Sequence, residues 1–98
     1  MSRELIIRPE AETDLADAFE WYEARVPGLG LEFIRTVDSL FSSIIRNPQA
    51  YPVVYKTVRR ALTRKFPYEV FFIVEVGSIA ILAVFHARRN PKRWQERI

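Results

Sequence analysis

Two consecutive segments near the C-terminus, residues 68–76 and 79–85, constrain the fold of this 98-residue chain more than any other part. Both are rich in β-branched and aromatic residues, and the Gly77-Ser78 pair between them predicts a tight turn joining two antiparallel strands. Because side chains alternate between the two faces of a strand, both segments present apolar residues on both faces. A sheet built around these strands needs a cover on each side.

The period-two alternation assigns the apolar side chains of these strands to faces. In the first strand, one face carries Tyr68, Val70, Phe72 and Val74, and the other carries Phe71 and Ile73. In the second strand, one side carries Ile79, Ile81, Ala83 and Phe85, and the other carries Ala80, Leu82 and Val84. The alternation alone leaves open how the faces of the two strands line up.

The N-terminal half of the chain supplies helices. Residues 5–7 form a short apolar run that predicts a strand, and Pro9 suits the first turn of a helix after it. Apolar residues then recur every three or four positions as far as Pro27, and again as far as Pro48. We expect these two helices to form an antiparallel hairpin that covers one face of an antiparallel sheet. The predicted fold class is α+β, in a single domain spanning residues 1–98.

The other face of the sheet has no comparable cover. The tail from Arg88 to Ile98 is mostly polar, with Trp94 and Ile98 as its apolar anchors, so it could cover only part of a sheet. Burial of a Phe, Ile or Leu side chain contributes about 1.5–3 kcal/mol, which makes an open face unfavourable. We therefore expect a partner protein or a second copy of the chain to cover this face; the alternative is a tail that folds back over it. The expected contact residues for the partner are Phe71, Ile73, Leu82 and Val84.

Composition and charge exclude several functional classes. The chain has no cysteine and one histidine, His86, so we expect no disulfide, no metal site and no cofactor. The N-terminal apolar run is far shorter than a signal peptide or a membrane span, which favours a cytoplasmic protein without a membrane partner. The net charge of +3 divides unevenly, since residues 1–50 carry −4 and residues 51–98 carry +7. The basic half suits nucleic acid, ribosomal RNA or an acidic protein segment.

Four short motifs occur in an order that is typical of one protein family. They are Ala11-x-x-Asp14-Leu15, Asn47-Pro48, Arg59-Arg60 leading into Phe66-Pro67-Tyr68, and Val84-Phe85-His86-Ala87-Arg88-Arg89-Asn90-Pro91-x-x-Trp94. Over nearly its whole length the chain resembles the RelE/ParE superfamily of bacterial type II toxins. The resemblance implies an N-terminal strand, a helical hairpin, a three-stranded antiparallel meander and a short C-terminal helix or tail, with about four strands in all. It also implies a cognate antitoxin, ParD-like or similar, that wraps the toxin and through which alone operator DNA is bound.

The superfamily contains two kinds of toxin within one fold. RelE-like members cleave mRNA in the ribosome, whereas ParE-like members poison DNA gyrase. Metal-independent RNA cleavage needs a proton acceptor, cations beside the phosphate and a proton donor. The candidates for these roles are Arg60, Arg64, His86 and Arg88. Active RelE-like nucleases carry a tyrosine near the C-terminus, where this chain has Trp94, which lacks an acidic hydroxyl.

The missing tyrosine favours a ParE-like inhibitor of gyrase that performs no chemistry of its own. The first alternative is a ribosome-dependent mRNA endonuclease. The second is an inactive homologue that retains only antitoxin binding and autoregulation of its operon.

Basic residues define two candidate binding surfaces. The target surface flanks a predicted turn at residues 90–91 and consists of Arg88, Arg89, Lys92, Arg93 and Trp94. A solvated basic tail is the alternative interpretation of that cluster. The antitoxin surface would use the forked guanidinium groups of Arg59 and Arg60 to bind acidic side chains. We expect residues 58–66 to form a strand, with Arg60 and Arg64 on one face and Arg59 and Lys65 on the other.

Overall fold

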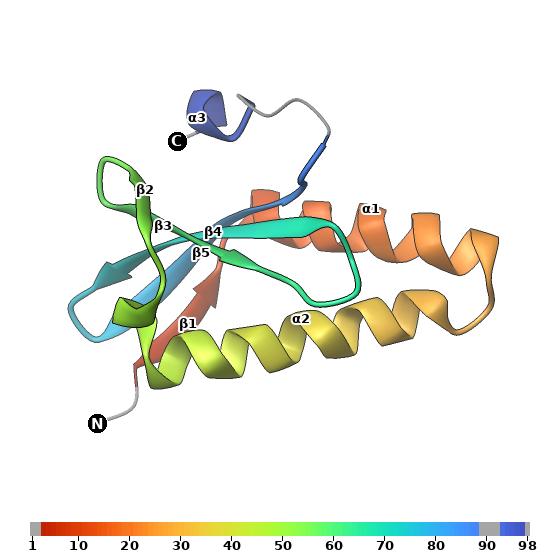
Figure 1. Ribbon diagram of the computed structural model, residues 1–98, viewed down its shortest axis with the longest axis horizontal. Helices are drawn as coiled ribbons and strands as arrows, with labels where there is room; N and C mark the ends of the chain where they lie inside the picture. Colours follow the sequence, from red (N-terminus) through yellow and green to blue (C-terminus); the bar gives the residue numbers. More distant parts are fainter. Residues whose placement is uncertain (1–2, 89–92, 98) are drawn as a thin grey trace.

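The chain runs through a strand, a helical hairpin, four further strands and a short C-terminal helix (Figure 1). The computed structural model describes residues 3–88 and 93–97. Its elements are β1 (Glu4–Ile7), α1 (Pro9–Arg25), α2 (Leu29–Arg46), the 3-10 helix η1 (Pro48–Ala50), β2 (Val53–Tyr55), β3 (Val58–Leu62), β4 (Tyr68–Glu75), β5 (Ser78–His86) and α3 (Arg93–Arg97). The predicted α+β fold class is confirmed.

The strands form one five-stranded sheet in the order β1-β5-β4-β3-β2. Strands β2 to β5 make an antiparallel meander, whereas β1 pairs with β5 in parallel, with Leu5 opposite Ile79. The sheet therefore has one strand more than the sequence predicts, because residues 53–55 pair with β3. It is also mixed and not wholly antiparallel, because of the direction of β1.

Both long helices pack on the same face of the sheet, where they form the main core (Figure 1). The residues of α2 that face the sheet recur every three or four positions and are buried: Phe33, Val37, Phe41 and Ile44. The sheet residues opposite them have no exposed surface: Val70, Phe72, Ile79 and Ile81. The three- and four-residue periodicity in the sequence thus corresponds to the side of α2 that is buried against the sheet. The predicted helical hairpin is confirmed.

The turn between α1 and α2 is fixed by one carboxylate and two glycines. Glu23 accepts the backbone N–H groups of Gly28, at 2.8 Å, and Gly30, at 2.9 Å. These amides lie at the start of α2, where backbone N–H groups have no partner within the helix and the helix dipole favours a negative charge. Gly28 has φ of 91°, which favours glycine, and a Cβ on Gly30 would lie 2.7 Å from the carbonyl oxygen of Phe19. The two helices consequently approach closely at this end.

The second face of the sheet carries a smaller apolar cluster that is covered within the chain. Its buried members are Val58, Phe71, Ala80, Leu82 and Ala83. Phe71 has no exposed surface and Leu82 is 6% exposed. Arg97 of α3 packs its guanidinium carbon 4.4 Å from the ring centroid of Phe85, at the border of this cluster. The prediction of an open second face is therefore wrong. The alternative, a C-terminal segment that folds back over this face, is the one observed, and Arg97 makes the contact. Trp94 and Ile98, which the sequence suggests as anchors, lie outside the residues whose side chains are described.

A β-bulge in β5 changes which residues face the helices. Phe71 pairs with Ala83 and Phe72 with Ile81, so Leu82 has no partner in β4. The extra residue reverses the alternation beyond it. Val84 therefore belongs to the main core at 2% exposure, while Ala83 and Phe85 join the second face. The predicted placement of Val84 on the second face is wrong, whereas that of Phe71, Ile73 and Leu82 is confirmed.

Candidate functional site

The four nuclease candidates do not form one constellation. Arg60 in β3 lies opposite Phe71 in β4, which places its side chain on the second face. Its guanidinium forms an ion pair with Glu69 at 3.3 Å. Arg64 lies in the loop between β3 and β4. His86 ends β5, and its Nδ1 accepts the backbone N–H of Arg88 at 3.1 Å. The chain thus brings His86 and Arg88 together and separates them from the other two.

Both arginines predicted for the antitoxin surface are bonded within the chain. Arg59 donates to the carbonyl oxygen of Tyr51 at 2.6 Å and to Oε1 of Gln49 at 2.9 Å. The side chain of Arg60, paired with Glu69, remains 38% exposed. The two lie on opposite faces of β3, as period two predicts, because they pair with Phe72 and Phe71 respectively.

The predicted target surface is described only in part. Arg88 is exposed and follows β5 directly. Arg89 and Lys92 lie outside the described residues, as do the side chains of Arg93 and Trp94, whose backbone opens α3.

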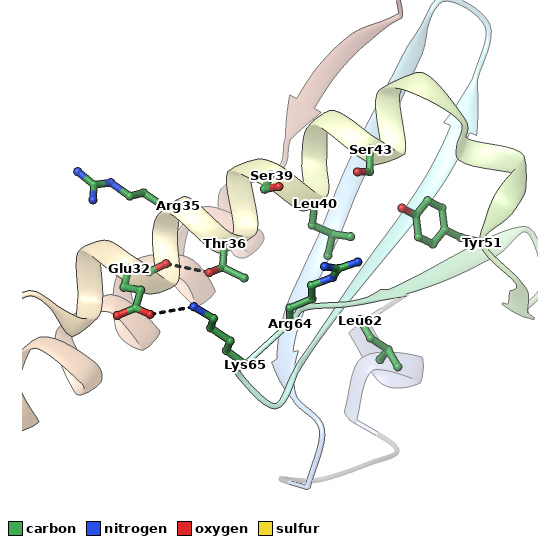
Figure 2. Close-up of a pocket in the computed structure, with 10 residues that line it drawn as sticks. All are labelled: Glu32, Arg35, Thr36, Ser39, Leu40, Ser43, Tyr51, Leu62, Arg64 and Lys65. Atoms are coloured by element: carbon green, nitrogen blue, oxygen red, sulfur yellow. Dashed lines mark hydrogen bonds and ion pairs between the residues drawn. The ribbon is translucent and has the colours of Figure 1, made fainter.

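A groove between α2 and the β3–β4 loop has a volume of about 610 Å³ (Figure 2). We call it the α2 groove. Its lining residues are Glu32, Arg35, Thr36, Ser39, Leu40, Ser43, Tyr51, Leu62, Arg64 and Lys65. Those from α2 follow a helical stripe beside the buried one, and those from the opposite wall come from the end of β3 and the loop. The sequence draws attention to Arg64 only as a nuclease candidate and does not predict the groove, because the groove joins two segments that are distant in the chain.

The wall of the α2 groove opposite α2 is a loop anchored in the core. Strand β3 ends at Leu62, so Arg64 and Lys65 do not continue it, and the predicted strand over residues 58–66 is too long. Lys65 has φ of 68°, which bends the chain sharply at this point. Phe66 follows and is 7% exposed, with its ring centroid 4.9 Å from that of Tyr22. Arg64 and Lys65 are therefore held beside a buried aromatic anchor.

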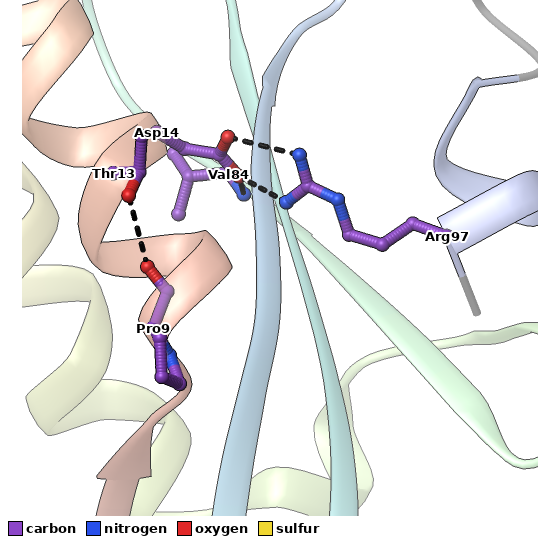
Figure 3. A network of polar contacts seen from close by, with 5 residues as sticks. All are labelled: Pro9, Thr13, Asp14, Val84 and Arg97. Atoms are coloured by element: carbon purple, nitrogen blue, oxygen red, sulfur yellow. Dashed lines mark hydrogen bonds and ion pairs between the residues drawn. The ribbon is translucent and has the colours of Figure 1, made fainter.

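A second cavity, of about 430 Å³, lies between α1, the end of β5 and α3. Asp14 lines this cavity and is the hub of a polar network (Figure 3). Its Oδ2 accepts the backbone N–H of Val84 at 2.9 Å, and both its oxygens accept the guanidinium of Arg97, at 2.6 and 3.1 Å. Strand β1 ends at Ile7, opposite Ile81, so it does not extend far enough along β5 to pair with Val84. The Asp14 carboxylate therefore accepts the backbone N–H of Val84 in place of a strand carbonyl oxygen. The Ala11-x-x-Asp14-Leu15 motif pointed to this residue without indicating its role.

The described residues lack two other kinds of site. The longest helices among them, α1 and α2, have 17 and 18 residues. No helix in that part of the chain is long and apolar enough to cross a membrane. Nor do any three His, Asp or Glu side chains there form a group able to hold a metal ion.

Comparison with known proteins identifies the family. Residues 5–91 match the family described as the ParE toxin of the type II toxin-antitoxin system, parDE. The chain belongs to the ParE toxin family. It is 30% identical over 99 residues to Toxin ParE2 from two Mycobacterium tuberculosis strains, CDC 1551 / Oshkosh and H37Rv, with all of this chain and 94% of each relative covered. The resemblance to the RelE/ParE superfamily is confirmed, on the ParE side.

Solved structures support the fold. A chain from the chromosomal ParDE TA system of P. aeruginosa superposes with a TM-score of 0.77 at 18% sequence identity, covering 86% of this chain and 95% of that one. This likeness establishes the shared fold. Together with the family match, it makes the chain a ParE-type toxin of a type II toxin-antitoxin system, a class of toxin that pairs with an antitoxin.

Proposed function

We propose that this ParE-family toxin inhibits DNA gyrase by binding to it, without chemistry of its own. The observation that carries the proposal is the separation of the nuclease candidates: Arg60 is paired on the second face, Arg64 lines the α2 groove, and His86 lines the cavity beside α1. General acid-base catalysis needs such groups within hydrogen-bond reach of one substrate. Membership of the ParE family supports the same target, because ParE-like toxins poison gyrase.

The basic segment after β5 is the surface proposed to contact gyrase. Arg88, its first residue, is exposed. Arg89, Lys92, Arg93 and Trp94 complete the segment in the sequence. A cluster of cations attracts DNA phosphates and acidic protein surfaces, so this segment is suited to contact an enzyme that works on DNA.

The antitoxin in this proposal is ParD-like, and operator DNA is bound only through it. The second face of the sheet is a poor site for its first contact, because Phe71 and Leu82, which lie on that face, are buried in the free chain, and Val84 lies in the main core instead. Ile73 and Arg60 are the members of the predicted antitoxin surface that keep partial exposure there. Toxin, antitoxin and gyrase would meet in the cytoplasm.

The experiment that tests the target compares two assays on the purified toxin. We expect the toxin to block gyrase-dependent supercoiling of a relaxed plasmid, to leave mRNA on translating ribosomes intact, and to lose its effect when the antitoxin is added. Cleaved mRNA with normal supercoiling would instead identify a ribosome-dependent nuclease. Absence of both effects would identify an inactive homologue.

Two variants separate binding from chemistry. His86→Ala should leave inhibition of supercoiling unchanged, because no proton transfer is needed. Arg88→Ala should weaken inhibition several-fold by removing one cation from the contact surface, while the exposed Arg8→Ala serves as a control of equal charge change. Loss of toxicity in His86→Ala with unchanged antitoxin binding would contradict the proposal.

A further inference from the structure

The covered second face leaves open where the antitoxin makes its contact. We infer that an acidic, amphipathic helix of the antitoxin docks in the α2 groove. This inference rests on the pairing of the toxin with an antitoxin and names the surface and the chemistry of the partner segment. It does not depend on gyrase being the target.

The length of the groove matches a short helix. Its α2 wall extends from Glu32 to Ser43, which corresponds to about 16 Å along a helix axis. Three turns of a partner helix span the same distance. The other wall is the β3–β4 loop, so the groove has two sides along which a helix can lie (Figure 2).

The charge of the groove selects an acidic partner. Three of its lining residues are cations, Arg35, Arg64 and Lys65, and one is an anion, Glu32, whose Oε1 is 3.6 Å from Nζ of Lys65. Within the described residues, Arg35 and Arg64 form no ion pair or hydrogen bond, and both are exposed. Their guanidinium groups are therefore available for carboxylates of a partner.

The groove also offers apolar contacts of the kind that an amphipathic helix uses. Leu40 and Tyr51 inside the groove are half-buried, and Leu62, which is 59% exposed, lies at the rim with its side chain directed away from α2 (Figure 2). In Figure 2 the side chain of Arg64 extends toward Leu40, and Tyr51 lines the same groove, so a carboxylate that binds Arg64 lies near apolar side chains. A helix with acidic residues beside an apolar stripe fits this arrangement.

The loop wall of the groove is held rigid before a partner arrives. Thr63 donates its hydroxyl to the carbonyl oxygen of Phe66 at 2.6 Å, and its backbone N–H to that of Tyr68 at 3.1 Å. Phe66 is buried against Phe33, with ring centroids 5.3 Å apart. A wall ordered in the free protein lowers the entropy lost on binding.

The cavity at α1 and β5 does not suit the same partner. Its lining includes the carboxylates of Asp14 and Asp17, and Asp14 already binds Arg97. An acidic helix would meet like charges there. Of these two cavities, the α2 groove is therefore the one whose charge suits an acidic helix.

The test measures binding of full-length toxin variants to the antitoxin encoded by the neighbouring reading frame. In the groove variant, Arg35→Glu and Arg64→Glu are combined; both side chains are exposed, so the fold should be retained. We expect affinity to fall by roughly tenfold or more, with a shallower dependence on salt, because two attractions become repulsions. The milder Arg35→Gln and Arg64→Gln pair replaces the first variant if its circular dichroism shows misfolding.

A matched control reverses two cations that line a cavity at the second face. Arg8→Glu combined with Lys56→Glu makes the same change in net charge, and both residues lie outside the groove. We expect this control to bind the antitoxin like the wild type. Normal antitoxin affinity in the groove variant, or a larger loss in the control, would overturn the inference. Loss of gyrase inhibition with unchanged antitoxin affinity would instead assign the groove to the target and equally overturn it.

A supercoiling assay on the same variants keeps the two proposals distinguishable. If the toxin inhibits gyrase, the groove variant should still inhibit it and should need more antitoxin for relief. If the wild-type toxin has no effect on gyrase, the proposed target is wrong, while the affinity measurements still decide the groove.

Discussion

Removal of the Asp14 carboxylate should destabilise the toxin more than removal of the Arg97 guanidinium that it binds. Asp14→Ala leaves the backbone N–H of Val84 without its acceptor, which amounts to about 1–3 kcal/mol. It also removes a bidentate ion pair with Arg97. The side chains of Asp14 and Arg97 are 12% and 28% exposed, so this pair is intermediate between a surface and a buried ion pair and should contribute about 1–2 kcal/mol to stability. Arg97→Ala loses the ion pair and the packing on Phe85, about 0.5–1 kcal/mol. The expected losses in the free energy of unfolding are thus about 2–5 kcal/mol for Asp14→Ala and about 1.5–3 kcal/mol for Arg97→Ala.

The assay is urea unfolding followed by circular dichroism, for the two single variants, the double variant and Asp14→Asn. The double-mutant cycle should give a coupling energy of about 1–2 kcal/mol between Asp14 and Arg97, and the coupling should shrink as salt is added. Asn at position 14 keeps an acceptor for Val84 and should recover about 1 kcal/mol relative to Ala. Asp17→Ala is the control, because Asp17 is an exposed carboxylate one turn along α1 and should change stability by less than about 0.5 kcal/mol.

Two results would refute this reasoning. Equal losses for the two single variants would mean that the bond to Val84 contributes no more than the packing of Arg97 on Phe85. A coupling energy near zero would mean that α3 is not held to α1 through Asp14.

Three further variants test other parts of the fold by the same unfolding assay. Glu23→Ala removes the acceptor of two amides at the start of α2 and should lower stability by about 1–2 kcal/mol, with Glu20→Ala, an exposed neighbour on α1, as a neutral control. Gly30→Ala places a Cβ 2.7 Å from a backbone oxygen of α1 and should lower stability by about 1–3 kcal/mol; an unchanged midpoint would mean that the helices separate freely. Val76→Lys should change stability by less than about 0.5 kcal/mol, because this valine in the β4–β5 turn is fully exposed.

The helices and the central strands could be predicted from the sequence because their signals are local. The four- and three-residue spacing of Val37, Phe41 and Ile44 is itself part of the buried stripe of α2. In β4, strict alternation places Phe71 and Phe72 on opposite faces, as observed. β5 departs from this because its bulge depends on the pairing with β4, which alternation within one strand does not contain. Alternation within β5 alone therefore places Val84 on the wrong face.

The sites were harder to predict because they depend on contacts between distant segments. The α2 groove joins residues 32–43 to residues 62–65, and neither segment carries a motif. Asp14 stood out in a motif, yet its function follows only from the short β1, which leaves the edge of β5 open at Val84. The apolar content of the C-terminal segment does not predict that this segment covers the second face, because the contact is made by an arginine of α3 that packs over Phe85.

The β3–β4 loop lies between the α2 groove and the start of the C-terminal basic segment. On one side, Arg64 and Lys65 line the groove. On the other side, the carbonyl oxygen of Pro67 accepts the backbone N–H of Ala87 at 2.7 Å, and Arg88 follows directly. An antitoxin helix in the groove would therefore lie within a few residues of the segment proposed to contact gyrase, so that it would exclude gyrase by its bulk without reshaping the toxin. Antitoxin and gyrase should then compete for the toxin, and isolation of a stable ternary complex would contradict this arrangement.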